Sequence, residues 1–274
     1  MSLSRVTSRN FAAIGTGLFG LALLSGCAAV NSGLSLADLE HVHSVATDGE
    51  EFFLASHHGL YALSEDSWTL RGDEMDLMGF SISDGIFYGS GHPGPRQPLP
   101  NPLGILVSED GGRSWVPDAL TGEVDFHLLE VSGDTMVGVA ANYGIVITSI
   151  DGGKSWSSIE VPALTSLVLN PANGNELLLA SDGVLLKSSE AGKPFEPVAT
   201  PASANLLEWS DGGVYYATST KIYFSPVPEG PFAALSKEFN KITALAASSK
   251  AVIVMDGNGV HVSRDNGITF ELLP

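Results

Sequence analysis

The stretch SEDGGRSW, residues 108 to 115, returns 41 residues later as SIDGGKSW, residues 149 to 156. A third full copy is SRDNGITF, two weaker copies are SSEAGKPF and SPVPEGPF, and SEDSW is a copy that lacks three turn residues. The six copies begin at residues 64, 108, 149, 188, 225 and 263, at intervals of 44, 41, 39, 37 and 38 residues. A period of about 40 residues indicates one supersecondary unit repeated six times.

Short β-rich runs surround each copy in the same order. In the third unit three runs precede the copy and one follows it, at residues 124 to 131, 135 to 140, 144 to 148 and 156 to 161. Runs of about five residues bounded by Gly, Asp and Asn predict strands, and no segment beyond the N-terminal region has the apolar spacing of an amphipathic helix. Four antiparallel strands in each of six units predict an all-β, six-bladed β-propeller.

The predicted blades are contiguous in sequence. Their ranges are 41–75, 76–120, 121–161, 162–200, 201–239 and 240–274. Because each blade takes its four strands from one stretch of chain, we expect the ring to close by packing of blade 1 against blade 6, without a strand swapped between them.

The repeated octapeptide is similar to the Asp-box, or BNR repeat, of sialidases, sortilin-like receptors and photosystem-assembly propellers. This resemblance implies that each box closes the hairpin between the two outer strands of a blade. The aspartate would accept turn amide hydrogens, the glycines would allow positive φ, and the aromatic residue would pack beneath. The resemblance also places the boxes opposite the usual ligand face, so their role is structural. The box residues are Asp110, Trp115, Asp151, Trp156, Asp265 and Phe270.

A closer resemblance covers most of the predicted propeller. Its segments are HVHSVATDG (41 to 49), LASHHGLYAL (54 to 63), DLMGFSIS (76 to 83), GSGHPGPRQPLPNPLGILVSEDGG (89 to 112) and VDFHLLEVS (124 to 132). They resemble a group of bacterial Asp-box lipoproteins often labelled glycosyl hydrolases. That resemblance implies a propeller outside the cytoplasm, and it implies no particular chemistry.

The first 26 residues have the pattern of a lipoprotein signal peptide. Arg5 and Arg9 precede an apolar run over residues 11 to 24 that is too short to span a bilayer stably. The run ends in Leu-Ser-Gly-Cys, which resembles a lipobox and predicts lipidation of Cys27, the one cysteine in the chain. An ordinary secretory signal is the alternative. Residues 27 to 40 are then a tether, residues 41 to 274 the propeller, and the protein an extracytoplasmic one anchored to the bacterial cell membrane by lipid.

The chain is strongly acidic, with 31 Asp and Glu against 13 Lys and Arg and a net charge of −18. Such a surface repels nucleic acid and anionic headgroups, so neither is an expected partner. Besides the membrane, which the lipid would contact, the expected partner is a glycan or a protein of the cell envelope.

Six of the seven histidines fall on one predicted face of blades 1 to 3. His41, His43 and His127 lie at the start of innermost strands, together with Asp76 and Asp125. The predicted turn between the second and third strands of blade 1 contains His57 and His58. His92 begins a stiff loop, residues 91 to 102, in which five of twelve residues are proline and which also carries Arg96.

We expect this face to be the binding surface of a non-enzymatic ligand-binding or scaffold propeller. Its expected contacts are His41, His43, His57, His92, Arg96 and His127. A divalent transition metal such as zinc, copper or iron is an alternative ligand. Residues two apart on a strand share a face, so histidine and aspartate side chains at this spacing can bind one metal ion together. The predicted metal ligands are His41, His43, Asp125 and His127. Without a metal, the same side chains would hydrogen-bond to one another or to water.

A glycoside hydrolase is the enzymatic alternative, with Asp76 and Asp125 as candidate carboxylates. It predicts turnover that is lost when either aspartate becomes asparagine. A true sialidase is not expected, because binding its substrate carboxylate takes three arginines. After residue 26 the chain has only Arg71, Arg96, Arg113 and Arg264, and the last two lie inside the repeated boxes.

Overall fold

The computed structural model describes residues 34–65, 67–190 and 194–273. The chain divides into two units, Met1–Ser32 and Gly33–Pro274, and the second unit carries all the described structure. The predicted signal peptide and Cys27 lie outside the described residues. Within these residues no helix is long and apolar enough to cross a membrane.

The described residues form a short 3-10 helix, Leu36–Asp38, and six four-stranded sheets. Blade 1 contains β1 (Val42–Thr47), β2 (Phe52–Ser56), β3 (Gly59–Ser64) and β4 (Ser67–Arg71). Blade 2 contains β5 (Met75–Ser83), β6 (Ile86–Pro93), β7 (Ile105–Ser108) and β8 (Val116–Ala119). Blade 3 contains β9 (Phe126–Ser132), β10 (Thr135–Ala140), β11 (Ile145–Ser149) and β12 (Ser157–Ile159).

The second half of the ring repeats this organisation with shorter outer strands. Blade 4 contains β13 (Ser166–Asn170), β14 (Asn173–Ser181), β15 (Val184–Ser188) and β16 (Glu196–Val198). Blade 5 contains β17 (Leu206–Ser210), β18 (Gly213–Ala217), β19 (Ile222–Ser225) and β20 (Ala233–Ala234). Blade 6 contains β21 (Ala244–Ala247), β22 (Val252–Asp256), β23 (Gly259–Ser263) and β24 (Glu271–Leu272).

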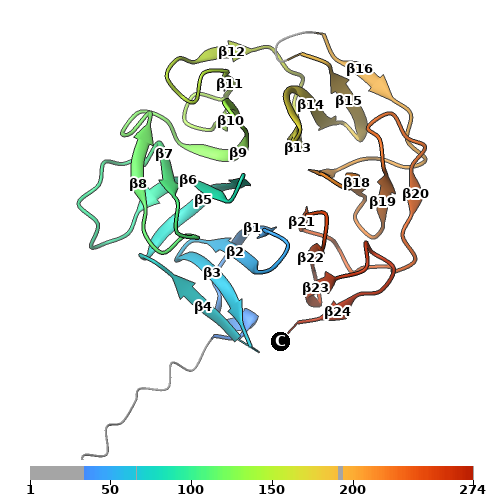
Figure 1. The fold of residues 1–274 in the computed structure, drawn as a ribbon, viewed down its shortest axis with the longest axis horizontal. Helices are drawn as coiled ribbons and strands as arrows, with labels where there is room; N and C mark the ends of the chain where they lie inside the picture. Colours follow the sequence, from blue (N-terminus) through green and yellow to red (C-terminus); the bar gives the residue numbers. More distant parts are fainter. Residues whose placement is uncertain (1–33, 66, 191–193, 274) are drawn as a thin grey trace, which may run out of the picture. The chain divides into compact units, whose positions relative to one another are not determined.

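The six sheets stand around a central opening, with the first strand of each sheet innermost (Figure 1). In every sheet the strands follow in chain order and pair antiparallel. This arrangement confirms the predicted all-β, six-bladed propeller. The prediction succeeded because each blade is built from local hairpins, whose turns are visible in the sequence.

Side chains pack between neighbouring blades rather than in one central core. The junction of blades 6 and 1 has its own apolar cluster, in which Leu54 and Trp68 of blade 1 meet Ile253 of blade 6. No strand of the described residues is exchanged between these two blades, so the ring closes by packing alone, as predicted. Leu34 adds one antiparallel bridge to Trp68, on the outer strand of blade 1.

The repeated octapeptides form the turns between the third and fourth strands of blades 2, 3 and 6. In each turn an aspartate carboxylate accepts the amide hydrogen of the residue four positions later, from Ser114, Ser155 and Thr269 respectively. The hydroxyl groups of the same three residues also bond the carboxylates, and these contacts lower the pKa of Asp110, Asp151 and Asp265 to about 2. These hydrogen bonds lie within each turn, so the repeat serves the fold.

The innermost strands of blades 1 to 3 share an irregularity near their first residues. In β1 the pairing with β2 skips His43, in β5 the pairing with β6 skips Met78, and in β9 the pairing with β10 skips His127. Each is a β-bulge, in which one extra residue bends the strand and re-aims a side chain. The three bulges occupy equivalent positions, at the end of the blades where the candidate site lies.

Candidate functional site

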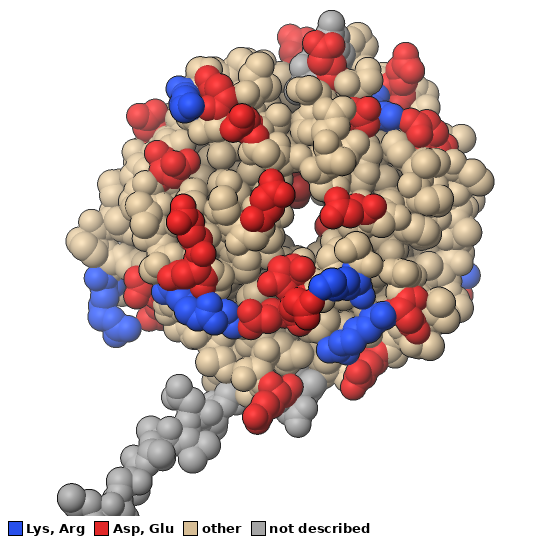
Figure 2. All heavy atoms as spheres, in the orientation of Figure 1, with Lys and Arg blue, Asp and Glu red and all other residues tan. Residues whose placement is uncertain are grey.

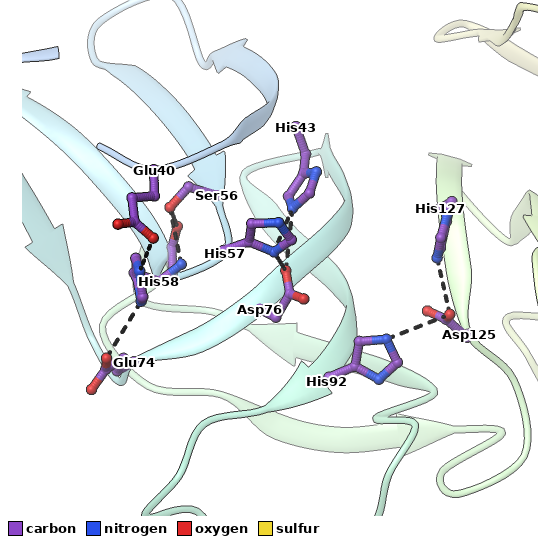
Figure 3. A network of polar contacts seen from close by, with 11 residues as sticks. Glu40, His43, Ser56, His57, His58, Glu74, Asp76, His92, Asp125 and His127 are labelled. Atoms are coloured by element: carbon purple, nitrogen blue, oxygen red, sulfur yellow. Dashed lines mark hydrogen bonds and ion pairs between the residues drawn. The ribbon is translucent and has the colours of Figure 1, made fainter. Parts of the chain in front are cut away.

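Two histidines and one aspartate meet where blade 1 adjoins blade 2 (Figure 3). His43 is the bulge residue of β1, His57 follows β2, and Asp76 lies in β5. The Oδ1 atom of Asp76 lies 3.2 Å from Nε2 of His43 and 2.9 Å from Nδ1 of His57. One ligand atom from each residue lies within 4.8 Å of the other two. We call these three residues the first cluster.

The hydrogen bonds of the first cluster depend on which ring nitrogens carry a hydrogen. Nε2 of His43 and Nδ1 of His57 are 3.3 Å apart, too close for both to carry a hydrogen that points at the other. Either nitrogen, when it carries the hydrogen, can donate it to Oδ1 of Asp76. Burial lowers the pKa of His43, whereas the negative charge of Asp76 acts in the opposite direction. The neutral imidazole that results is the form that binds a metal ion.

His41 lies beside the first cluster. Its ring centroid is 5.1 Å from that of His57 and 6.3 Å from that of His43. Its backbone has a φ of 45°, in the left-handed region, and its carbonyl oxygen accepts the His57 amide hydrogen at 3.3 Å. His41 therefore helps to hold the turn that presents His57.

A second cluster lies where blade 2 adjoins blade 3, and consists of His92, Asp125 and His127 (Figure 3). Oδ2 of Asp125 lies 3.0 Å from Nε2 of His127 and 3.6 Å from Nε2 of His92. Asp125 is 9 % exposed, and its Oδ1 atom has no hydrogen-bond partner among the described residues. Nδ1 of His92 lies 2.7 Å from the side-chain oxygen of Asn101 in the proline-rich loop.

The structure thus divides the predicted set of metal ligands. The predicted ligands were His41, His43, Asp125 and His127. Among them, only Asp125 and His127 contact each other through atoms that could bind a metal. His43 instead meets His57 and Asp76. The expected grouping paired residues two apart on one strand, but the bulge at His43 turns this side chain toward the next blade.

A chain of weaker ion pairs runs along the outer side of the face. His58 lies 3.5 Å from a carboxylate oxygen of Glu40 and 3.6 Å from one of Glu74, and Arg96 lies 3.5 Å from the other oxygen of Glu74. The Arg96 side chain is 88 % exposed. Exposed pairs at such distances contribute little to stability. Arg96 remains a predicted contact for an anionic group.

The seventh histidine, His261, lies away from both clusters in blade 6. Its Nε2 atom is 3.0 Å from Oδ1 of Asp256, and both side chains are buried. Burial alone would raise the pKa of Asp256, but hydrogen bonds from the Asn240 and Asn258 amides and from His261 outweigh it and leave the pKa lowered. This pair stabilises one blade and offers no open position.

A cavity of about 450 Å³ runs along the innermost strands, with His43 at its lining. Sequence reasoning missed two of its acidic residues, Glu130 of β9 and Glu208 of β17. Burial raises the pKa of Glu208 to about 8, and burial with the nearby charge of Glu208 raises that of Glu130 well above its usual value. The matching pentapeptides LLEVS (128–132) and LLEWS (206–210) were a signal that could have found them.

The face around the opening is rich in carboxylates (Figure 2). No described site gathers three arginines. Arg71 donates to Glu51 at 2.6 Å and lies near the carbonyl of Gly111, and Arg113 and Arg264 lie in the repeated turns. The described residues therefore contain no arginine triad of the kind that binds a carboxylate in sialidases.

The comparisons with known proteins indicate a common fold. No family model matches the chain. The vacuolar protein sorting/targeting protein 10 of Schizosaccharomyces pombe is 34 % identical over 82 residues, which cover 28 % of this chain and 5 % of that protein. This chain therefore matches only a small part of that curated relative.

Among solved structures, the nidogen/laminin complex contains a chain similar to this one with a TM-score of 0.57 at 12 % identity, covering 82 % of this chain and 93 % of that one. A GH74 xyloglucanase from Xanthomonas campestris has a TM-score of 0.54 at 16 % identity over 85 % of this chain and 38 % of its own. The extracellular domain of a putative hybrid two-component system from B. thetaiotaomicron has a TM-score of 0.55 at 16 % identity. The match covers 88 % of this chain and 34 % of that one. The likeness is one of fold.

Proposed function

We propose that this chain is an extracytoplasmic ligand-binding propeller and that its ligand is a divalent transition-metal ion held by His43, His57 and Asp76. The observation that carries the proposal is the first cluster itself. Three residues from two strands and a turn place one ligand atom each within 4.8 Å of one another. Two imidazoles and one carboxylate leave coordination positions open for water or a further ligand.

The chemistry of the cluster favours a transition metal over calcium or magnesium. Imidazole nitrogen suits zinc, copper, iron and nickel, whereas calcium and magnesium prefer oxygen ligands. The lowered pKa of His43 keeps its ring neutral near pH 7, so little proton release opposes binding. The net charge of −18 attracts cations to the protein.

The proposed location rests on the N-terminal sequence. Residues 1–26 have the pattern of an export signal, and acylation of Cys27 would supply the chains that stable anchoring requires. The similarity to an extracellular domain from B. thetaiotaomicron supports a place outside the cytoplasm. A relation to Asp-box propellers is part of the proposal and rests on the repeated turns. The glycoside hydrolase alternative rests on the carboxylates of Asp76 and Asp125.

Zinc titration followed by calorimetry tests the proposed function. The full chain, purified without a histidine tag and without chelators, is compared with His43→Ala and with His58→Ala. His58 is a matched control because it is adjacent to His57, half exposed, and outside both clusters. We expect tight binding by the wild type and by His58→Ala, with a loss of at least 10-fold in affinity at the first cluster in His43→Ala. Absence of binding by the wild type, or equal losses in both variants, would overturn the proposal.

A further inference from the structure

We propose that the central cavity binds a linear aliphatic polyamine, whose ammonium groups meet Glu130 and Glu208 and whose methylene chain lies along the apolar parts of the wall. This ligand is separate from the metal ion of the proposed function, because neither glutamate belongs to the first cluster. The cavity has a volume of about 450 Å³, within the usual range of small-molecule sites. The opening in the ring gives such a molecule a way in (Figure 2).

The two glutamates are the first argument. Glu130 of β9 and Glu208 of β17 each stand two residues before the last residue of their strand, so they lie at the same depth in the ring. Both line the cavity. No hydrogen bond or ion pair joins the Glu130 carboxyl to another described residue, and Glu208 accepts one hydrogen bond, from the Ala247 amide. Carboxyl groups deep in a protein are almost always paired, so the free oxygens of Glu130 are available to a ligand.

The charge of the wall is the second argument. Besides the two glutamates, the wall contains Asp48, Asp84 and Asp211, which follow the last residues of β1, β5 and β17. Among the described residues, no lysine or arginine lines the cavity. Burial raises the pKa of Glu208 to about 8, and burial with the charge of Glu208 raises that of Glu130 well above its usual value. An ammonium group beside these carboxyls would favour their charged form and so oppose the effect of burial.

The spacing of polar and apolar groups along the wall is the third argument. Asp211 follows Glu208 by three residues, and a strand rises about 3.3 Å per residue, so the two carboxyls lie at levels about 10 Å apart. Phe80, Leu128 and Leu206 also line the cavity and are half-buried. Methylene chains that end in a charged nitrogen pack against such apolar surface. A polyamine matches both features, whereas a metal ion would reach the carboxyls of one level.

Calorimetric titration with spermidine tests the proposal. The full chain is titrated in metal-free buffer at physiological ionic strength, at which exposed charges are screened beyond about 8 Å. It is compared with the cavity variant Glu130→Gln/Glu208→Gln and with Glu160→Gln/Glu196→Gln. The second pair is a matched control, because both of its glutamates are exposed and the two double variants have the same net charge. Octanediol, a chain without ammonium groups, is the control ligand.

We expect the wild type and the control variant to bind one spermidine per chain. The cavity variant should lose affinity by about 10-fold or more, the effect of removing one partner from buried charge pairs. Octanediol should not bind. Equal losses in the two double variants would mean that spermidine binds the acidic surface, and full affinity in the cavity variant would mean that it binds elsewhere. Either result, or a wild type that binds no spermidine or binds octanediol equally well, would overturn the proposal.

A second measurement needs no folded variant. Because burial keeps Glu130 and Glu208 protonated at pH 7, spermidine should move two glutamate carboxyl signals in the carbon-13 NMR spectrum of the wild type toward the ionised position. Signals that do not move would overturn the proposal. The outcome is independent of the zinc titration, since a chain that binds no zinc would contradict the proposed function and leave the polyamine site standing.

Discussion

The side-chain oxygen of Asn101 lies 2.7 Å from Nδ1 of His92 and fixes which nitrogen of that ring faces Asp125. Changing Asn101→Ala frees the ring to rotate and to exchange its hydrogen between nitrogens. We expect the nitrogen NMR signals of the His92 ring, which report one tautomer in the wild type, to become an average of two tautomers in Asn101→Ala. The zinc affinity of the first cluster should not change.

Nitrogen-15 NMR of the histidine rings, recorded for the wild type and for Asn101→Ala, measures this effect. Asn142→Ala is the wrong control, because it touches Asp125, whereas Asn175→Ala is exposed and remote from the clusters. An unchanged His92 signal in Asn101→Ala would show that the loop does not position this ring.

Glu208 in the central cavity should make stability depend on alkaline pH. Burial raises its pKa from 4.5 to about 8, with a smaller opposing effect of the Ala247 amide. A carboxyl whose pKa is raised on folding contributes stability that is complete below pH 4.5 and is lost as the pH rises through 8. Glu208→Gln should therefore melt close to the wild type at pH 5 and several degrees above it at pH 9.

Thermal unfolding at pH 5, 7 and 9 checks this expectation, with the exposed Glu160→Gln as control. A Glu208→Gln variant that loses stability equally at all three pH values would indicate that the charge of Glu208 is compensated in the folded protein.

The repeated turns should produce the opposite dependence in acid. Hydrogen bonds from the Ser155 hydroxyl, the Ser155 amide and the Ser149 hydroxyl lower the pKa of Asp151 from 3.8 to about 2. A carboxyl whose pKa is lowered contributes stability that is present above pH 3.8 and is lost as the pH falls through 2. Asp151→Asn should therefore be less stable than the wild type at pH 7, and the difference should shrink toward pH 2.

Urea unfolding between pH 2 and 7 measures the difference, and Asp182→Asn, at an exposed turn, is the matched control. A constant difference across this range would exclude an ionic contribution from Asp151.

Trp68 at the junction of blades 1 and 6 should tolerate a smaller aromatic residue. Its ring is fully buried, and its indole nitrogen has no hydrogen-bond partner among the described residues. Trp68→Phe leaves a small cavity but removes an unpaired N–H group, so we expect a loss below about 1.5 kcal/mol. Trp68→Ala removes the whole ring and should cost about 3–5 kcal/mol. Equal losses in the two variants, measured by denaturant unfolding, would mean that the indole nitrogen is bonded.

Anchoring should depend on Cys27. A Cys27→Ser chain cannot form the thioether to lipid, so we expect it to leave the membrane fraction of the cell, whereas Asn31→Ala should remain in it. Fractionation together with incorporation of labelled fatty acid measures the change. A Cys27→Ser protein that still sediments with membranes would contradict lipid anchoring.

The sequence predicts the fold well because the turns of a propeller are local. Ser108 to Trp115 and its copies mark the outer hairpins, and the strands before each copy follow from short runs between Gly, Asp and Asn. The face that carries His43, His92 and His127 follows from the same alignment of units. Strand pairing in each blade then required no long-range information.

The contacts within the site were harder to predict. Spacing alone paired His41 with His43, but a bulge at His43 re-aims this side chain toward Asp76 of the next blade. A bulge depends on pairing between strands and leaves no mark in spacing. Asn101 had no sequence signal, because its role depends on how a twelve-residue loop folds back onto His92.

Every hydrogen-bonded ladder of the described propeller is made within one continuous stretch of chain. The segments at the two ends of the propeller pack into the same apolar cluster. One end contributes Leu36 and Leu39, and the other contributes Leu273. The ends of the ring are therefore neighbours, and a short linker can join them. The order of the blades along the chain is then arbitrary. A circular permutant that begins at blade 4 and ends at blade 3 keeps all six sheets, and with them both histidine clusters.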